Sequence, residues 1–292
     1  MDSETNQLPN YLITQSPSPM PVLYLVGTPI GNLEDITLRA LRILKEVALI
    51  AAEDTRTTGR LLHHYDIKTP LTSYHEYTKP ERIEQLVAQL ASEDVALVSD
   101  AGMPGLSDPG YRLVKAALEQ GIKVVPIPGP SAAVSALISS GLPTDSFLFL
   151  GFLPRQKKAR RTALSDVASL PYTLVFYEAP HRLLASLAAM TDVLGNRQIV
   201  VGRELTKLYE EIWRGKISEA ADYFGQDQVR GEITVVVAGA EESEQQWDEE
   251  RIKAAVHQAL EQGLSRKDTA AKIAQQSGWR KRDVYNLILN LS

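Results

Sequence analysis

The alternation of short apolar runs with amphipathic stretches is the feature that most limits how this chain can fold. Apolar runs lie at 22–26, 47–52, 95–98 and 123–127. Helix-period stretches separate them, among them ITLRALRILKEV, PERIEQLVAQLAS and YRLVKAAL. Because strands that alternate with helices return to the same end of a sheet, this pattern predicts βαβ units and a mostly parallel sheet.

A second set of apolar runs follows residue 141. It comprises 147–152, 172–178, 198–205 and 232–239, with the helical stretch RLLASLAAM between two of them. The runs lie closer together than in the first set, which leaves room for mixed strand directions. We therefore expect an α/β class with two domains, at 21–141 and 142–240.

The two ends of the chain differ from this pattern. Residues 1–20 are polar with Ser-Pro repeats, and we expect a disordered arm. Residues 241–250 contain six acidic residues and predict a solvated linker. Residues 251–292 carry eight Lys or Arg against three acidic residues, and two amphipathic stretches flank Ser277-Gly278. This spacing predicts a helical, helix-turn-helix-like extension, which either binds nucleic acid or is a cap with a solvated basic face.

Composition narrows the function classes. The chain has 292 residues, no cysteine and a net charge of −5, so disulfides and thiolate metal sites are excluded. Any nucleic-acid contact has to come from local basic patches. No apolar run approaches the roughly 20 residues that span a bilayer. We expect a cytoplasmic protein without membrane contact.

Small and charged residues follow each of the first four predicted strands. The segments are VGTPIGN, AAEDTR, SDAGMPGLSDPG and PIPGPSAA. Since the carboxyl ends of parallel strands lie along one edge of the sheet, these segments predict a ligand crevice. Within AAEDTR, an acidic side chain can hold a ribose, or Asp54 or Thr55 can cap the following helix.

Other motifs limit the chemistry. The first loop lacks the G-x-G-x-x-G dinucleotide fingerprint, and the sequence has no Walker loop and no G-x-S-x-G. No spacing of His, Asp and Glu predicts a metal site. Five basic residues within 155–161 are either a solvated helix start or, together with 280–282, a phosphate-binding surface.

Seven motifs, in this order, resemble the tetrapyrrole (corrin/porphyrin) methylase superfamily. They are VGTPIGNLEDITLRAL, AAEDTR, SDAGMPGLSDPG, PIPGPSA, GFLP, FYEAPHR and GRELTK. They are most similar to the branch that methylates the 2′-oxygen of a cytidine in small-subunit ribosomal RNA. The usual G-x-G-P-G-D loop is replaced here by Gly27–Asn32, with Ile30 and Asn32 at two of its positions, which agrees with the RNA-directed branch.

The resemblance implies two α/β domains with S-adenosylmethionine in a cleft between them, a homodimer, and 16S ribosomal RNA in the decoding region, on the 30S subunit, as the partner. It also implies the residues that bind the cofactor. They are Ile30, Gly31, Asp100, Ala101, Gly102, Gly105, Ser131, Ala132, Tyr177, Glu178 and Leu205.

The implied reaction is transfer of a methyl group to a ribose hydroxyl, for which a general base can take the proton. Our first candidates for this base are Glu178 and Glu204, and Asp54 is the third. The predicted substrate-binding residues are all basic. They are Arg56, Arg203, Lys207, Lys157, Lys158, Arg160, Arg161, Arg280, Lys281 and Arg282.

Three alternatives stay open from the sequence. One is an enzyme of the same superfamily that acts on a tetrapyrrole or another small molecule. A second is a non-catalytic RNA-binding protein that keeps the cofactor fold. A third is a Rossmann-type methyltransferase with the cofactor inside the first domain and Glu53 on its ribose.

Overall fold

The computed structural model describes residues 20–240, 247 and 249–291, which fall into two compact units. The first unit comprises the described residues up to Ser139 and two later segments, Gly202–Ile212 and Gly231–Thr234. The other described residues form the second unit. The division therefore lies inside a helix near the expected border at 141, and two later segments belong to the first unit. The predicted arm at 1–20 lies outside the described residues except for residue 20, as does most of the predicted linker at 241–250.

The described chain alternates strands and helices as the sequence pattern predicts. The strands are β1 (Val22–Val26), β2 (Leu49–Ala52), β3 (Leu71–Ser73), β4 (Val95–Val98), β5 (Lys123–Ile127), β6 (Phe147–Phe152), β7 (Thr173–Glu178), β8 (Gln198–Arg203), β9 (Glu211–Lys216) and β10 (Ile233–Val237). The helices are η1 (Leu33–Asp35), α1 (Leu38–Glu46), α2 (Thr55–His64), α3 (Pro80–Gln89), α4 (Tyr111–Glu119), α5 (Ala132–Ser140), α6 (Lys157–Val167), η2 (Pro180–Arg182), α7 (Leu183–Leu194), α8 (Ile217–Phe224), α9 (Glu249–Glu261), α10 (Arg266–Ser277) and α11 (Lys281–Asn290).

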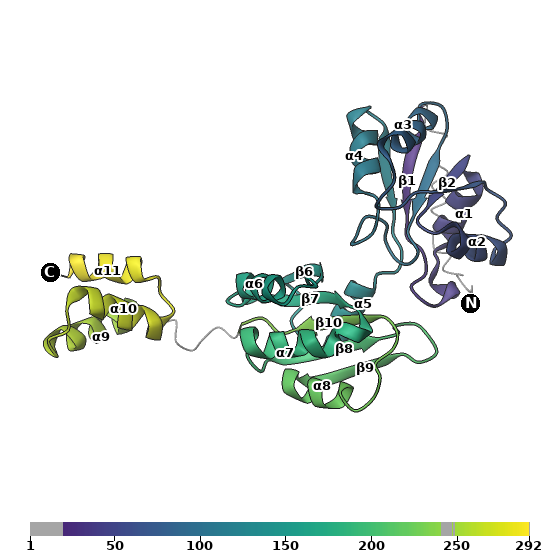
Figure 1. The fold of residues 1–292 in the computed structure, drawn as a ribbon. Helices are drawn as coiled ribbons and strands as arrows, with labels where there is room; N and C mark the ends of the chain where they lie inside the picture. Colours follow the sequence, from purple (N-terminus) through teal and green to yellow (C-terminus); the bar gives the residue numbers. More distant parts are fainter. Residues whose placement is uncertain (1–19, 241–246, 248, 292) are drawn as a thin grey trace, which may run out of the picture. The chain divides into compact units, whose positions relative to one another are not determined.

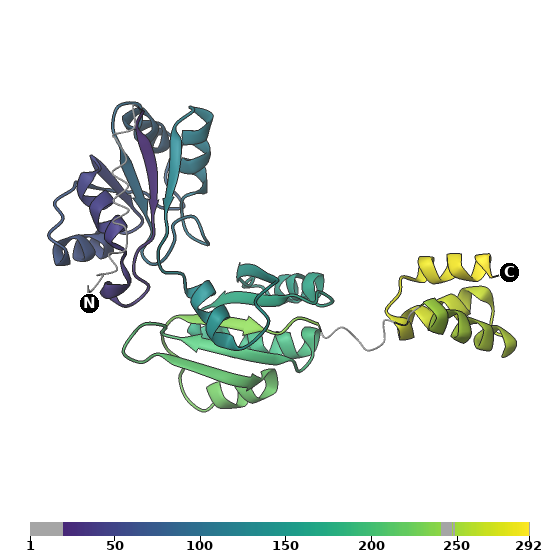
Figure 2. The same cartoon turned by 180° about the vertical axis from the view of Figure 1, so that it is seen from behind.

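The first sheet has the strand order β3-β2-β4-β1-β5, and all its strands run parallel. Figure 2 shows β1, in purple, inside this sheet rather than at its edge. Val22, Tyr24 and Val26 pack on one face with the apolar residues of α1 and α2. Leu23 packs on the other face with residues of α3 and α4, so both faces are covered, as a parallel sheet requires (Figure 1).

The strand order places a topological switch point between β1 and β4. The chain leaves β1 for β2 on one side of this pair, and it leaves β4 for β5 on the other side. The two connections therefore diverge at the carboxyl ends of adjacent strands. In open α/β sheets this is the place where ligands bind.

The second unit contains most of a sheet with the order β6-β7-β10-β8-β9, in which β6 and β7 run parallel. Helices α6, α7 and α8 pack against one another in sequence. The strand register between β6 and β7 shifts between Phe149 and Phe152, and both of these rings contact Tyr177. The predicted second α/β region, a sheet packed with helices, is thus confirmed.

The three C-terminal helices have a small core of their own. Ser265 caps α10, which ends at Gly278 in the left-handed conformation, and α11 follows at once. The buried side chains come from all three helices and are Ile252, Val256, Ala270, Ile273, Val284 and Ile288. The predicted helical extension is confirmed, although α9 already begins at Glu249.

Candidate functional site

The loops after β1 and β4 are joined by a short backbone bridge. The Thr28 N–H donates to the Gly102 carbonyl at 2.9 Å, and the Gly102 N–H donates back to the Thr28 carbonyl at 3.0 Å. The buried Thr28 hydroxyl also donates to the Ser99 carbonyl at 3.2 Å. This bridge holds the two loops together at the switch point.

The loops after β1 and β5 touch through two glycines. A Cβ built on Gly129 would lie 2.9 Å from the Cα of Gly27, and a Cβ on Gly27 would lie 2.8 Å from the Cα of Gly129. Real Cβ atoms do not approach this closely, so both positions require glycine. The glycines of VGTPIGN and PIPGPSA therefore let two strand ends meet, which leaves main-chain groups at the rim.

A third loop of the first unit, at 204–207, packs on Gly31. Any Cβ at Gly31 would overlap Lys207, and it would lie 2.9 Å from Thr206 Oγ1. Lys207 Nζ donates to Glu204 Oε1 at 2.8 Å and to Glu232 Oε2 at 3.1 Å. The Lys207 ammonium lowers the pKa of Glu204. Glu204 and Thr206 both have left-handed backbone, with φ of 50° and 67°, which is strained for these residue types.

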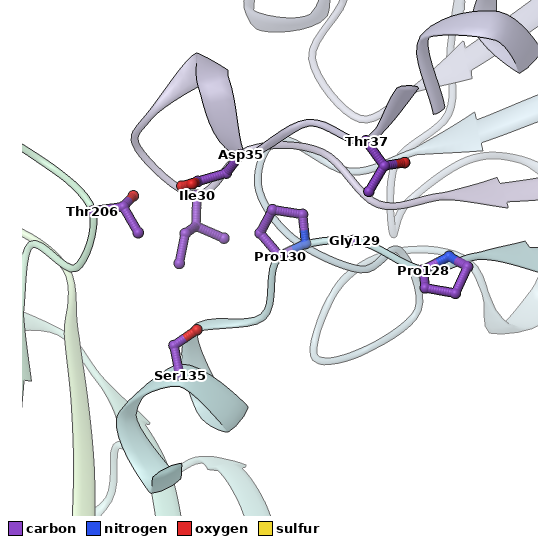
Figure 3. Close-up of a pocket in the computed structure, with 8 residues that line it drawn as sticks. All are labelled: Ile30, Asp35, Thr37, Pro128, Gly129, Pro130, Ser135 and Thr206. Atoms are coloured by element: carbon purple, nitrogen blue, oxygen red, sulfur yellow. The ribbon is translucent and has the colours of Figure 1, made fainter. Parts of the chain in front are cut away.

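The segments that follow β1 and β5, together with the 204–207 loop, line a cavity of about 430 Å³, shown in Figure 3. It is lined by Ile30, Asp35, Thr37, Pro128, Gly129, Pro130, Ser135 and Thr206. Two lining atoms, Asp35 Oδ2 and Thr206 Oγ1, are buried and have no hydrogen-bond partner within the described part of the chain. Buried polar atoms are normally satisfied, so these two indicate a polar ligand.

A second hollow of about 280 Å³ shares the β1 loop. Its lining residues are Thr28, Pro29, Gly31, Leu33, Thr57, Thr58, Arg60, Leu61, Ser99 and Asp100. The Arg60 guanidinium lies 3.3 Å from the Thr57 hydroxyl, to which it donates. This hollow therefore offers a cation and hydroxyl groups at the carboxyl ends of β1, β2 and β4.

Acidic side chains tie the ends of β2 and β4 to each other. The Asp54 N–H donates to Asp100 Oδ1 at 3.0 Å, and the Asp100 N–H donates to Glu53 Oε2 at 3.3 Å. Asp54 also caps α2 by accepting from the Arg56 N–H at 2.8 Å, and its ion pair with the Arg56 side chain lowers its pKa to about 2. Of the two roles that the sequence left open for Asp54, the structure shows the helix cap.

Negative charge accumulates at this end of the sheet. Burial raises the pKa of Asp108 to about 6 against a hydrogen bond from Ser99, and the nearby carboxylates of Glu53, Asp100 and Glu232 raise it further. Burial also raises the pKa of Glu53 and of Asp100. The resulting potential favours a cationic ligand.

The predicted cofactor residues of the first unit surround the β1 loop. Ile30 lines the first cavity, and Gly102 lies behind it, since a Cβ there would be 3.5 Å from Ile30 Cγ2. Gly31 and Asp100 line the second hollow. The remaining members are Ala101 and Gly105 in the β4 loop, Ser131 and Ala132 at the start of α5, and buried Leu205 in the 204–207 loop.

Tyr177 and Glu178 belong to the second unit, at the end of β7. Glu178 is only 3% exposed; it pairs with Arg182 Nε at 3.4 Å and accepts from the Ala179 N–H at 2.9 Å and from the Ser186 hydroxyl. Arg182 in turn donates to the Leu153 carbonyl. A buried ion pair within FYEAPHR thus fixes Arg182, and the hydrogen bond from Arg182 to the Leu153 carbonyl joins this motif to GFLP. This gives Glu178 a structural role and leaves its carboxylate poorly placed to act as a base.

Five of the ten predicted substrate-binding cations form ion pairs, one of them Arg282 with Asp283 at 3.6 Å. Arg203 contacts Glu211 at 2.8 Å, Arg161 contacts Asp192 at 2.6 Å, and Arg56 and Lys207 are paired as described above. Arg160 is only 7% exposed, so its assignment to an exposed phosphate-binding surface is wrong. It lies on the buried stripe of α6 with Leu164 and Val167, at a spacing typical of a packed helix face. The exposed cations of the set are Arg56, Lys157, Lys158, Arg280, Lys281 and Arg282.

Sequence reasoning missed Asp35, Thr206, Thr57 and Arg60 as lining residues. Asp35 lies within the quoted motif VGTPIGNLEDITLRAL, but only the structure shows that one of its oxygens is buried without a partner. Within the described residues, no cluster of His, Asp and Glu is suited to hold a metal ion, and no helix has the length and apolar character to cross a membrane.

Comparison with known proteins defines the class. The family profile for Tetrapyrrole (Corrin/Porphyrin) Methylases matches residues 22–221. The fold is similar to that of the methyltransferase CobJ, with a TM-score of 0.58 at 18% identity, covering 76% of this chain and 95% of that one. It is also similar to uroporphyrin-III-C-methyltransferase from Thermus thermophilus, with a TM-score of 0.51 at 22% identity, covering 74% and 93%. The chain belongs to the tetrapyrrole methylase family.

The particular relatives are closer in sequence. A protein of Halalkalibacterium halodurans is 50% identical over 91% of this chain and 93% of its own length, and one of Bacillus subtilis is 48% identical over 92% and 94%. Both are named ribosomal RNA small subunit methyltransferase I. The chain is accordingly a methyltransferase that takes its methyl group from S-adenosylmethionine. The glycine-lined rim and the negative potential fit this cationic molecule.

We expect Gly129→Ala to destabilise the first unit by about 1–3 kcal/mol, because its methyl group would overlap Gly27. Amide hydrogen exchange in β1 and β5 measures this change. Gly59→Ala is the matched control: its methyl group would lie 3.9 Å from Leu71, and alanine in α2 should stabilise by about 0.5–1 kcal/mol. Equal protection in both variants would contradict the proposed contact.

We expect Asp108→Asn to change how stability depends on pH. Because burial raises the folded pKa of Asp108 to about 6, the folded state binds the proton more tightly than the unfolded state. Its contribution to the free energy of unfolding therefore falls as pH rises from about 4 to 6 and stays low above. Asparagine removes this fall, so the variant should gain stability relative to the parent between pH 5 and pH 8. Denaturant titrations at both values test this, and a constant difference would refute it.

Proposed function

We propose that this methyltransferase modifies the 2′-oxygen of the ribose of a cytidine in the decoding region of 16S ribosomal RNA, with the 30S subunit as the substrate. The observation that carries the proposal is 44–51% identity to proteins named for small-subunit ribosomal RNA methylation, seven of the eight compared covering more than nine-tenths of this chain. That the methyl group goes to a ribose oxygen, and that the nucleotide is a cytidine, is inferred from the resemblance of the motifs to the RNA-directed branch.

The rim of the first sheet is suited to hold the donor. Ile30, Gly102 and Gly129 would bring main-chain groups and a small apolar surface to the cavity, and the acidic end of the sheet would stabilise the sulfonium charge. Bound there, S-adenosylmethionine supplies an electrophilic methyl group. The task of the chain is then to place a hydroxyl oxygen about 3 Å from that carbon and to take its proton.

The exposed cations would bind the RNA backbone. Lys157 and Lys158 lie in the first turn of α6, and Arg280, Lys281 and Arg282 lie where α11 begins. Exposed Tyr285 follows on α11 and offers a ring on which a base can stack. Phosphate contacts of this kind give affinity without sequence choice, so the choice of cytidine has to come from the cavities.

A homodimer in the cytoplasm remains part of the proposal. Val134 and Ile138 of α5 are 46% and 71% exposed, and apolar side chains of this size on one helix are common at subunit interfaces.

Incubation of the full chain with methyl-labelled donor and 30S subunits should place the label on one cytidine of 16S RNA. The bond 3′ to that residue should resist alkali, because a methylated 2′-oxygen cannot attack the phosphate. Reverse-transcription stops and nucleoside analysis locate the label. Label on a base, or transfer to a porphyrinogen but not to 30S subunits, would contradict the proposal.

Removing basic residues should weaken binding of 30S subunits in a salt-dependent manner. Lys157→Ala with Lys158→Ala, and separately the triple alanine variant at 280–282, should lower the slope of log affinity against log salt by about 0.7–0.9 per lost phosphate contact. Cofactor affinity should not change. Lys115→Ala on α4 is the control, because this exposed lysine is paired with Glu119 at 3.8 Å. An unchanged slope would exclude these residues from the RNA interface.

A further inference from the structure

One carboxylate oxygen in the first cavity has no visible structural use. Asp35 Oδ2 is buried, lines the cavity and lacks a hydrogen-bond partner within the described residues. A buried acceptor that is left unsatisfied costs about 1–3 kcal/mol, and more when it is charged. Such an arrangement is expected where a ligand supplies the missing donor.

Helix capping does not account for this side chain. Asn32 caps η1 by accepting from the Glu34 N–H at 3.1 Å, and Thr37 caps α1 by accepting from the Ala40 N–H at 3.1 Å. The Asp35 N–H is bound to the Asn32 carbonyl at 3.1 Å, so its backbone is fixed between the two caps. Its carboxylate caps neither helix, because Asn32 and Thr37 already fill both cap positions.

The carboxylates proposed earlier as bases are engaged in other ways. Glu178 is buried in an ion pair with Arg182, Glu204 is bound by Lys207 and by the Glu232 N–H, and Asp54 caps α2 beside Arg56. Each of these three carboxylates would have to break such bonds before it could take a proton. Asp35 Oδ2 has no such bond to break.

The groups opposite Asp35 indicate what the ligand offers. Figure 3 shows the Asp35 carboxylate above Ile30 with Thr206 beside it, whereas Ser135 lies on the opposite side of Ile30. Thr206 Oγ1 is the second buried atom without a partner, and it is held there by strained left-handed backbone. Strain of this kind persists mainly at functional sites. A carboxylate and a hydroxyl beside an apolar side chain suit the neighbouring hydroxyls of a ribose.

We propose that Asp35 is the catalytic base that accepts the ribose hydroxyl proton, and that Thr206 binds the adjacent ribose oxygen. The inference rests on the proposed function. The hydroxyl proton moves to Asp35 Oδ2 while the oxygen forms a bond to the methyl carbon. The methyl–sulfur bond breaks, its electron pair stays on sulfur, and the sulfonium charge is thereby neutralised.

The test compares Asp35→Asn with Asp35→Glu and with Glu34→Gln. Glu34 is the matched control, since it is an exposed carboxylate on the same turn. For each full-length variant we would measure donor affinity by calorimetry, affinity for 30S subunits, melting temperature and the single-turnover rate of methyl transfer. The product of the parent is mapped first.

We expect Asp35→Asn to lower the single-turnover rate by about 10²–10⁴-fold, the usual contribution of a general base, with both affinities within about twofold of the parent. Asp35→Glu should recover part of the rate, and Glu34→Gln should behave as the parent. If Asp35→Asn and Asp35→Glu melt at the same temperature, a difference in their transfer rates reflects the carboxylate and not the stability of the fold.

Three outcomes would overturn the assignment. A rate within tenfold of the parent in Asp35→Asn would show that another group takes the proton. Lost donor affinity would make Asp35 a cofactor-binding residue instead, and no recovery in a folded Asp35→Glu would remove the role of the carboxylate. If the parent itself labels a base rather than a sugar, the proposed function fails, and this is visible before any variant is compared.

Discussion

The contact among the loops that follow β1, β4 and β5 is the constraint on which the rest of the site depends. Two backbone hydrogen bonds join Thr28 to Gly102, and the Cα atoms of Gly27 and Gly129 are so close that no side chain fits. Because the connections after β1 and β4 diverge, these loops would otherwise leave a gap at the carboxyl end of the sheet. The contact narrows this gap to two hollows on the β1 loop, and it fixes the turn that carries Asp35.

The family motifs acquire separate physical roles in this arrangement. AAEDTR and SDAGMPGLSDPG connect β2 and β4 through carboxylates that accept backbone N–H groups, while GRELTK supplies the strained loop that packs on Gly31. FYEAPHR contains a buried ion pair in the second unit and is bound to GFLP by a hydrogen bond from Arg182 to the Leu153 carbonyl. Several charged residues of these motifs therefore hold the loops in place through hydrogen bonds and ion pairs.

The sequence was sufficient for the class of fold, because strands buried on both faces and amphipathic helices carry periodic signals that no other packing reproduces. It also placed the glycine loops at one edge. It could not show that 204–207 and 231–234 join the first unit, since that depends on contacts between distant segments. The positive charge of Arg160 suggested an exposed position, but its spacing from Leu164 and Val167 places it on the buried face of α6. The orphaned oxygen of Asp35 follows from packing alone and has no signature in the sequence.

The negative charge at the switch point would connect binding of the donor with release of the product. Burial and mutual repulsion hold Asp108, Glu53 and Asp100 in an unfavourable negative cluster, as their raised pKa values show. A cation would relieve this repulsion, so a sulfonium donor bound beside the cluster would be stabilised more than the neutral thioether that remains after transfer. Part of the affinity would then be lost in the chemical step itself. Asp108, whose raised pKa of about 6 weakens the folded state once its carboxyl is ionised, would in this way favour exchange of product for fresh donor.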